Sequence, residues 1–256
     1  DTAMGTTFAT GAAQGRAEER FFFKLACAIA LVLVAGFSVH LAMGRSSFDA
    51  PLLFHLHGVV FFGWVGLFLV QTGLMAGGNV ALHKRLGWLS ALWVPLMVVL
   101  GFAITLASLR RNGGPFFFDA NEFLFGNPAG ILAFATLVGA AVALRKRTDW
   151  HRRLMLGAMA SIAGPGFGRL LPMPLMIPYA WELSNLICMG FVVAGMIRDK
   201  RHHGAVHPAW LAALIVPLVF LTLGQIIAYS PWGIELTRQV LEGHPGAARP
   251  MAAYLP

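Results

Sequence analysis

Charged residues are scarce in this chain of 256 residues. Asp, Glu, Lys and Arg together make up 12% of the sequence, where an ordinary soluble domain has roughly a quarter. Hydrophobic residues make up 57%, and the mean hydropathy is +0.70. A composition this apolar excludes a typical soluble domain and predicts a polytopic membrane protein.

Cysteines and catalytic motifs are also scarce. The two cysteines, Cys27 and Cys188, lie in separate apolar stretches toward opposite membrane faces, which argues against a disulfide between them. The sequence GPGFG at 164–168 lacks the Lys and the strand-to-helix setting of a phosphate-binding loop. No hydrolase or nucleotide-binding motif stands out, so these classes are not favoured.

Seven apolar stretches approach the length of about 20 residues that a helix needs to span a bilayer. They cover residues 22–43, 52–75, 86–109, 128–144, 154–171, 181–197 and 209–229. The sequence therefore predicts an all-α membrane bundle of about seven transmembrane helices, with the two chain ends on opposite sides.

The net charge of +8 is concentrated in the loops between these stretches. If the N-terminus is cytoplasmic, thirteen cations lie inside: Arg16, Arg20, Lys24, Lys84, Arg85, Arg145, Lys146, Arg147, Arg152, Arg153, Arg198, Lys200 and Arg201. Six lie outside: Arg45, Arg110, Arg111, Arg169, Arg238 and Arg249. This bias predicts a cytoplasmic N-terminus and an outer C-terminus. Membrane lipids with anionic headgroups, rather than nucleic acid, are the expected partners of the basic loops.

Three regions are expected along the chain. Residues 1–20 are rich in Thr, Ala and Gly and predict a flexible N-terminal segment. Residues 21–230 form the seven-helix membrane domain. Residues 231–256 form an outer-side tail, with one short amphipathic helix at 234–241.

The second apolar stretch carries a polar stripe. His57, Trp64 and Gln71 recur every seven residues, which returns them to within about 20° of one helix face. This face must meet protein, because the indole N–H and the amide would be unsatisfied in lipid. His55 lies about 200° from His57 on a regular helix, so the two cannot share one site. We therefore expect His57 in a buried site and His55 at the interface.

The fifth stretch contains helix-breaking residues. Gly164, Pro165, Gly166 and Gly168 predict a break at 164–168, which is tolerated at membrane depth only where protein or a cavity shields it. Arg169 follows directly in the outer leaflet, and Glu182 is its expected partner. Together with His40, these residues predict a buried polar site in the outer leaflet.

Two further histidines begin helices near the predicted cytoplasmic face, His83 in HKRLGW and His151 in DWHRRLM. Together with HLHG and the later Trp and Gln, these motifs resemble a group of bacterial multi-pass membrane proteins without an assigned biochemistry, over roughly residues 21–212. The resemblance implies the bacterial inner membrane. The His-Arg-Leu helix starts are also loosely similar to the cytochrome b561 and ferric-reductase groups, although the deep His pairs of those haem proteins are missing here.

Several functions fit these residues. Haem b is held by neutral His from adjacent helices, and His40 with His57 or His83 with His151 could supply the pair. A quinone could hydrogen-bond to His57, Arg169 and Glu182 and stack on Trp64. Either ligand would favour electron transfer.

Other readings remain open on the sequence alone. His40, His55 and His57 could bind a metal. The buried polar residues could also serve only to join helices in an accessory subunit of a larger membrane complex. A small-molecule transporter is a further alternative.

Overall fold

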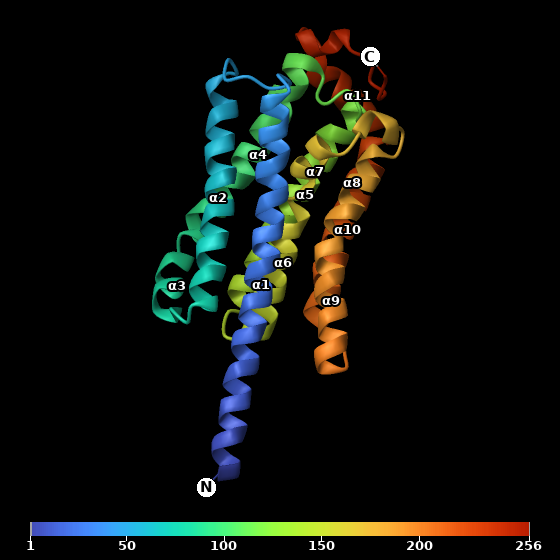
Figure 1. Ribbon diagram of the computed structural model, residues 1–256. Coiled ribbons are helices and arrows are strands. Elements are labelled where there is room, and N and C mark those ends of the chain that lie inside the picture. The colour runs from blue at the N-terminus through green and yellow to red at the C-terminus, as the bar shows by residue number, and fades with distance from the viewer. Residues whose placement is uncertain (1, 256) are drawn as a thin grey trace.

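The computed structural model describes residues 2–255, with side chains from Gly15 onward, and this part of the chain is helical throughout, without strands (Figure 1). The helices are α1 (Thr2–Ala42), α2 (Leu52–Ala76), α3 (Val80–Gly87), α4 (Ser90–Asn112), α5 (Ala120–Ala143), α6 (Thr148–Ser161), α7 (Gly164–Leu170), α8 (Ala180–Cys188), α9 (Gly190–His203), α10 (Pro208–Ala228) and α11 (Pro231–Leu241). Two short 3₁₀ turns cover Met173–Met176 and Pro245–Ala248. The predicted all-α architecture is confirmed.

Among the described residues, six helical segments are long and apolar enough to cross a membrane: Gly15–Ala42, α2, α4, α5, Ala180–His203 and α10. Large apolar side chains cover their outer surfaces, with Leu92 77% exposed and Leu218 65% exposed. Exposed aliphatic residues at this density suit lipid rather than water. The bundle has the character of a multi-pass integral membrane protein.

The fifth apolar stretch is the exception, because it forms two short helices. α6 ends at Ser161 and α7 begins at Gly164, so the interruption lies at Ile162 and Ala163, just before the expected 164–168. The glycines there serve packing. A Cβ on Gly36 of α1 would collide with the carbonyl of Gly166. The count of seven spanning segments stays a prediction.

The centre of the bundle is formed by α5, which packs against α4, α6 and α10. Phe134, Leu156 and Trp210 are fully buried there. Small residues allow close packing: a Cβ on Gly195 of α9 would collide with the indole ring of Trp210. This packing fixes α6 and α5 relative to each other and so positions the site described below.

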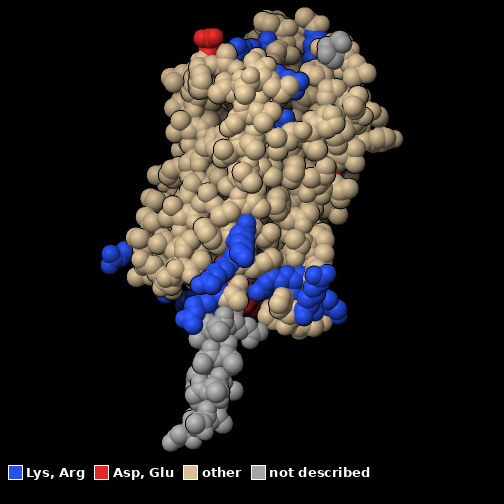
Figure 2. All heavy atoms as spheres, in the orientation of Figure 1, with Lys and Arg blue, Asp and Glu red and all other residues tan. Residues whose placement is uncertain are grey.

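Most cations gather at one end of the bundle, which we call the basic end (Figure 2). It is formed by the lower part of α1, by α3, by the α5–α6 connection and by the end of α9 (Figure 1). The chain ends at the opposite end, where a smaller group of cations lies. This arrangement agrees with the charge bias of the sequence, while the cytoplasmic location of the basic end stays a prediction.

The tail packs across the end of the bundle opposite the basic end. α11 includes the short helix expected at 234–241 and begins three residues earlier. Arg249 donates hydrogen bonds to four carbonyl oxygens in the α4–α5 connection, those of Gly113, Gly114, Pro115 and Phe118. The tail thereby satisfies carbonyl groups of the loop that follows α4. The flexibility expected of residues 1–20 stays a prediction.

Candidate functional site

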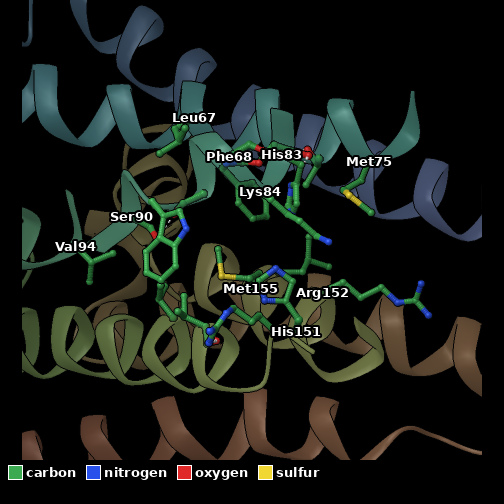
Figure 3. Close-up of a pocket in the computed structure, with 18 of the residues that line it drawn as sticks. Leu67, Phe68, Met75, His83, Lys84, Ser90, Val94, His151, Arg152 and Met155 are labelled. Atoms are coloured by element: carbon green, nitrogen blue, oxygen red, sulfur yellow. Dashed lines mark hydrogen bonds between the residues drawn. The ribbon is translucent and has the colours of Figure 1, made fainter. Parts of the chain in front are cut away.

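A cavity of about 880 Å³ opens in the half of the bundle near the basic end. It is enclosed by α2, α3, α4, α5 and α6, with Glu19 and Phe22 contributed by α1 (Figure 3). Its walls are mainly apolar and aromatic: Trp64, Phe68, Met75, Trp88, Val94, Val138 and Met155. A volume of this size is within the roughly 300–1,000 Å³ range of small-molecule and cofactor sites.

His83 reaches this cavity because α3 folds back against α2. The chain turns at Gly78, whose φ of +80° suits glycine, and the Asn79 side chain caps α3 by accepting the Leu82 N–H at 3.2 Å. The Nδ1 atom of His83 lies 3.3 Å from the carbonyl oxygen of Gln71. A carbonyl can only accept, so Nδ1 carries the proton and Nε2 keeps its lone pair.

His151 reaches the same cavity from the first turns of α6. Its Nδ1 atom lies 2.9 Å from the carbonyl oxygen of Ala141, near the end of α5. The same reasoning therefore assigns the proton to Nδ1 and the lone pair to Nε2. In both histidines a backbone carbonyl fixes the tautomer and the orientation of the ring.

The two imidazoles lie close together in the wall of the cavity (Figure 3). Their centroids are 6.1 Å apart and their planes are inclined by 83°. Among the described residues, neither Nε2 atom has a hydrogen-bond partner. The cavity therefore contains two oriented imidazoles with free lone pairs.

The protonation state of His83 follows from its surroundings. Burial lowers the pKa of His83 below its ordinary value, against the opposing effect of the Gln71 carbonyl, and the charges of His151 and Lys84 lower it further. α3 lies outside the six candidate spans. His83 is therefore neutral near pH 7, the state in which imidazole binds metals.

The deeper wall of the cavity carries polar atoms that lack partners. Trp64 Nε1, Gln71 Nε2 and Gln71 Oε1 are buried without a hydrogen bond in the described part of the chain. A buried unpaired polar group costs about 1–3 kcal/mol. Two of the three stripe residues thus line the cavity with unsatisfied groups, which favours a bound ligand.

Cations surround the cavity toward the basic end: Lys84, Arg145, Lys146 and Arg152. Arg152 is neutralised by Glu18 at 2.7 Å and Glu19 at 3.2 Å. Lys84 and Lys146 form no ion pair with any described residue. The cavity is therefore apolar within and positively charged at one end.

The third stripe residue, His57, does not line this cavity. Its ring packs on Phe61, with centroids 4.0 Å apart, and its Nδ1 atom is buried without a partner. His57 and Gln71 are fourteen positions apart, about 21 Å along a helix. Gln71 therefore lies at the cavity, while His57 lies nearer the opposite end of the bundle. His40 is partly exposed near the end of α1, and no described ring contact joins it to His57.

Arg169 and Glu182 do not form the expected pair. Arg169 donates to the carbonyl oxygen of Pro165 at 2.8 Å, and its guanidinium lies 3.8 Å from the centroid of the Phe37 ring. Glu182 is exposed on α8. The expected pairing was wrong because α7 packs against α1 and so turns Arg169 toward that helix. His55 bonds to the carbonyl of Phe48 at 3.1 Å, at the partly exposed start of α2.

Sequence reasoning missed a buried ionic network beside the cavity. Arg153, 3% exposed, donates to both carboxylate oxygens of Asp199 at 2.8 and 2.9 Å and to Glu18 at 3.3 Å. The indole of Trp210 donates to Asp199 at 3.0 Å. The network joins α1, α6, α9 and α10 and anchors the helix that carries His151. The one trace of this network in the sequence is the DWHRRLM motif, in which Arg152 and Arg153 directly follow His151.

Comparisons with protein-family models, curated proteins and solved structures found no match to this chain. The fold and the cavity together define a multi-pass helical membrane protein with a ligand-sized internal cavity near one end. Its function is inferred from that cavity.

Proposed function

We propose that the protein binds haem b in this cavity, with His83 and His151 as the two axial ligands, and that it transfers electrons within the membrane. The observation that carries the proposal is the pair of imidazoles, which backbone carbonyls orient, with ring centroids 6.1 Å apart and no hydrogen-bond partner at either Nε2 in the described chain. Haem b supplies reversible one-electron chemistry when bound.

The carbonyl partners of both rings support metal binding. Histidines that bind metals usually donate their other ring N–H to a carbonyl or carboxylate, which fixes the tautomer and raises the basicity of the ligand atom. His83 donates to Gln71 and His151 donates to Ala141. The ring centroids are 6.1 Å apart, which is close enough for one metal ion roughly 2.0–2.1 Å from a nitrogen of each ring.

The walls and the charged end support haem over a bare ion. A bare ion bound by two histidines leaves most of the 880 Å³ unused. A porphyrin has flat apolar faces suited to Trp64, Phe68 and Val138, and it carries two propionates at one edge. Lys84 and Lys146, without acidic partners in the described chain, are placed to receive them.

A quinone is the second candidate for the same cavity. Gln71 Nε2 and Trp64 Nε1 are buried donors without partners, and a quinone carbonyl would satisfy either of them. The imidazoles fit this ligand less well, because a neutral ring with its proton on Nδ1 offers no donor at Nε2. Two oriented lone pairs therefore favour haem.

Further expectations follow for the setting. We propose that the basic end faces the cytoplasm of a bacterial inner membrane, which places the cavity in the cytoplasmic half of the bilayer rather than in the outer leaflet. His40, His57, Arg169 and Glu182 then lie outside the cofactor site, near the opposite surface. An electron-transfer protein of this kind requires a redox partner, and subunits of a membrane complex are the proposed ones.

The test is chemical identification of the ligand. The protein is expressed with added haem precursor, purified in detergent, and examined by the pyridine haemochrome assay and by organic extraction with mass spectrometry. We expect about one haem b per chain in the wild type and a loss of most of it in His83→Ala and His151→Ala. His57→Ala is the matched control and should retain the haem.

Other outcomes separate the alternatives. Quinone in the extract without haem would replace the proposal by the second candidate. An empty protein that copurifies with other membrane subunits would support the accessory role, and transport of a solute in vesicles would support a transporter.

A further inference from the structure

A second, separate groove lies on the outside of the bundle at the basic end. α1 and α9 both pack against α6, and between them they leave a groove of about 310 Å³. It is lined by Phe21, Ala194, Ile197, Arg198, Arg201 and His202. The groove shares no lining residue with the large cavity.

The groove is amphipathic along its length. Ala194 and Ile197 lie before Arg198 and Arg201 in α9, so the apolar part is about one helical turn deeper in the bundle than the charged part. Phe21 of α1 forms the opposite apolar wall. Ile197 is 48% exposed beside the groove. An occupant must therefore be apolar toward the bilayer core and polar toward the membrane surface.

The polar end of the groove is positive, because two arginines, Arg198 and Arg201, line it. Arg198 is held over the Phe21 ring, 4.5 Å from the centroid, and its Nη1 atom is buried without a hydrogen bond. The nearest carboxylate oxygen, on Glu18, is 3.7 Å away and is shared with Arg152 and Arg153 at 2.7 and 3.3 Å. Arg201 forms no ion pair with a described residue.

We infer that this groove binds one anionic glycerophospholipid, with the phosphate at Arg198 and Arg201 and an acyl chain against Phe21, Ala194 and Ile197. Charge complementarity selects the anionic headgroup, because the two carboxylates behind the groove are bound more closely by other arginines, Glu18 by Arg152 and Asp199 by Arg153. The order of apolar and charged residues selects a lipid over a free anion. This site does not depend on the haem proposal.

The test is native mass spectrometry of the purified, delipidated protein titrated with phosphatidylglycerol or phosphatidylcholine in detergent. We expect one phosphatidylglycerol to bind in preference to phosphatidylcholine. The double variant Arg198→Gln/Arg201→Gln should weaken phosphatidylglycerol binding by about fivefold for each cation removed. Arg110→Gln/Arg238→Gln, which removes two cations from the opposite end, is the control and should bind as the wild type does.

A second variant keeps every charge and fills the groove. Ala194→Trp should weaken phosphatidylglycerol binding as strongly as the double variant, and millimolar inorganic phosphate should not displace the lipid. Unchanged binding in Ala194→Trp, equal binding of both lipids, or displacement by phosphate would each overturn the inference. The haem content of Ala194→Trp should equal that of the wild type. The lipid proposal and the haem proposal are therefore tested independently.

Discussion

The imidazole rings of His83 and His151 lie 6.1 Å apart in the wall of one cavity, although they belong to different helices and to distant parts of the sequence. A backbone carbonyl of another helix fixes each ring. The Gln71 carbonyl in the second half of α2 holds His83, and the Ala141 carbonyl near the end of α5 holds His151. The pair is thus preorganised before any ligand binds. Preorganisation lowers the cost of binding, since the protein loses little further freedom.

The cations beside the cavity give a prediction about affinity. Lys84→Ala/Lys146→Ala should weaken haem binding about tenfold or more, because two charge-assisted contacts to the propionates are lost. Transfer of haem to apomyoglobin measures the change. Lys24→Ala, which removes a cation of the same end outside the cavity, should leave the transfer rate unchanged. Equal rates in the double variant and the wild type would place the propionates elsewhere.

The buried network should dominate the stability of the basic end. Asp199→Asn leaves the Arg153 guanidinium, 3% exposed, without its bidentate partner. Removing one member of a buried pair costs about 3–5 kcal/mol. Unfolding in mixed detergent should report this loss, whereas Glu235→Gln, in the exposed pair with Arg238, should change stability by less than about 1 kcal/mol. A loss of similar size in both variants would contradict the assigned role.

The contact between α1 and α7 leaves no room for a side chain on Gly36. Gly36→Ala would place a Cβ against the Gly166 carbonyl, and overpacking of this kind costs about 1–3 kcal/mol. Gly168→Ala is the matched control, because its Cβ would meet open space. Thermal unfolding of the two variants compares them directly. Equal melting temperatures would show that α1 and α7 can separate without cost.

The pair of Asp149 and His207 predicts a dependence of stability on pH. Burial opposes the charge on Asp149, but the hydrogen bond from His207 Nε2 at 2.8 Å and backbone N–H groups hold the pKa of Asp149 below its ordinary value. A depressed pKa contributes stability above the unfolded value of about 3.9, and this contribution is lost as pH falls through the folded pKa.

The stability gap between the wild type and Asp149→Asn should therefore narrow as pH falls from about 6 to about 3. In a His207→Ala background the same gap should be smaller, since the imidazole donor is gone and only the backbone donors remain. Thermal unfolding across this range measures both comparisons. A gap that stays constant with pH would show that the pair does not stabilise the ionised carboxylate.

The sequence predicted the all-α architecture and most of the long apolar helices, because helix formation and hydropathy are local. Apolar length locates the spanning helices, and the seven-residue spacing of Trp64 and Gln71 locates one wall of the cavity. Spacing cannot tell which helix faces that wall. The stripe suggested a site beside His57, whereas the cavity forms lower, where α3 folds back and brings His83 to His151.

Contacts between residues that are far apart in the sequence could not be predicted from it. The sequence predicts a pair between Arg169 and Glu182 because only one loop separates them, yet the packing of Gly166 on α1 turns Arg169 toward Phe37. Glu18, Arg153 and Asp199 lie on three helices, so no spacing links them. The pairing of the two inner histidines was anticipated as one of two haem options, but from their similar motifs and not from geometry.

The reduced-minus-oxidised absorption spectrum tests most directly the proposal that His83 and His151 bind one haem iron. We expect a six-coordinate low-spin spectrum in the wild type. Exchange of either His83 or His151 for Gly should convert it to a five-coordinate form or abolish it, and added imidazole should restore it. A wild-type protein purified from haem-supplemented cells without a Soret band, or a low-spin spectrum that survives in both variants, would contradict the claim.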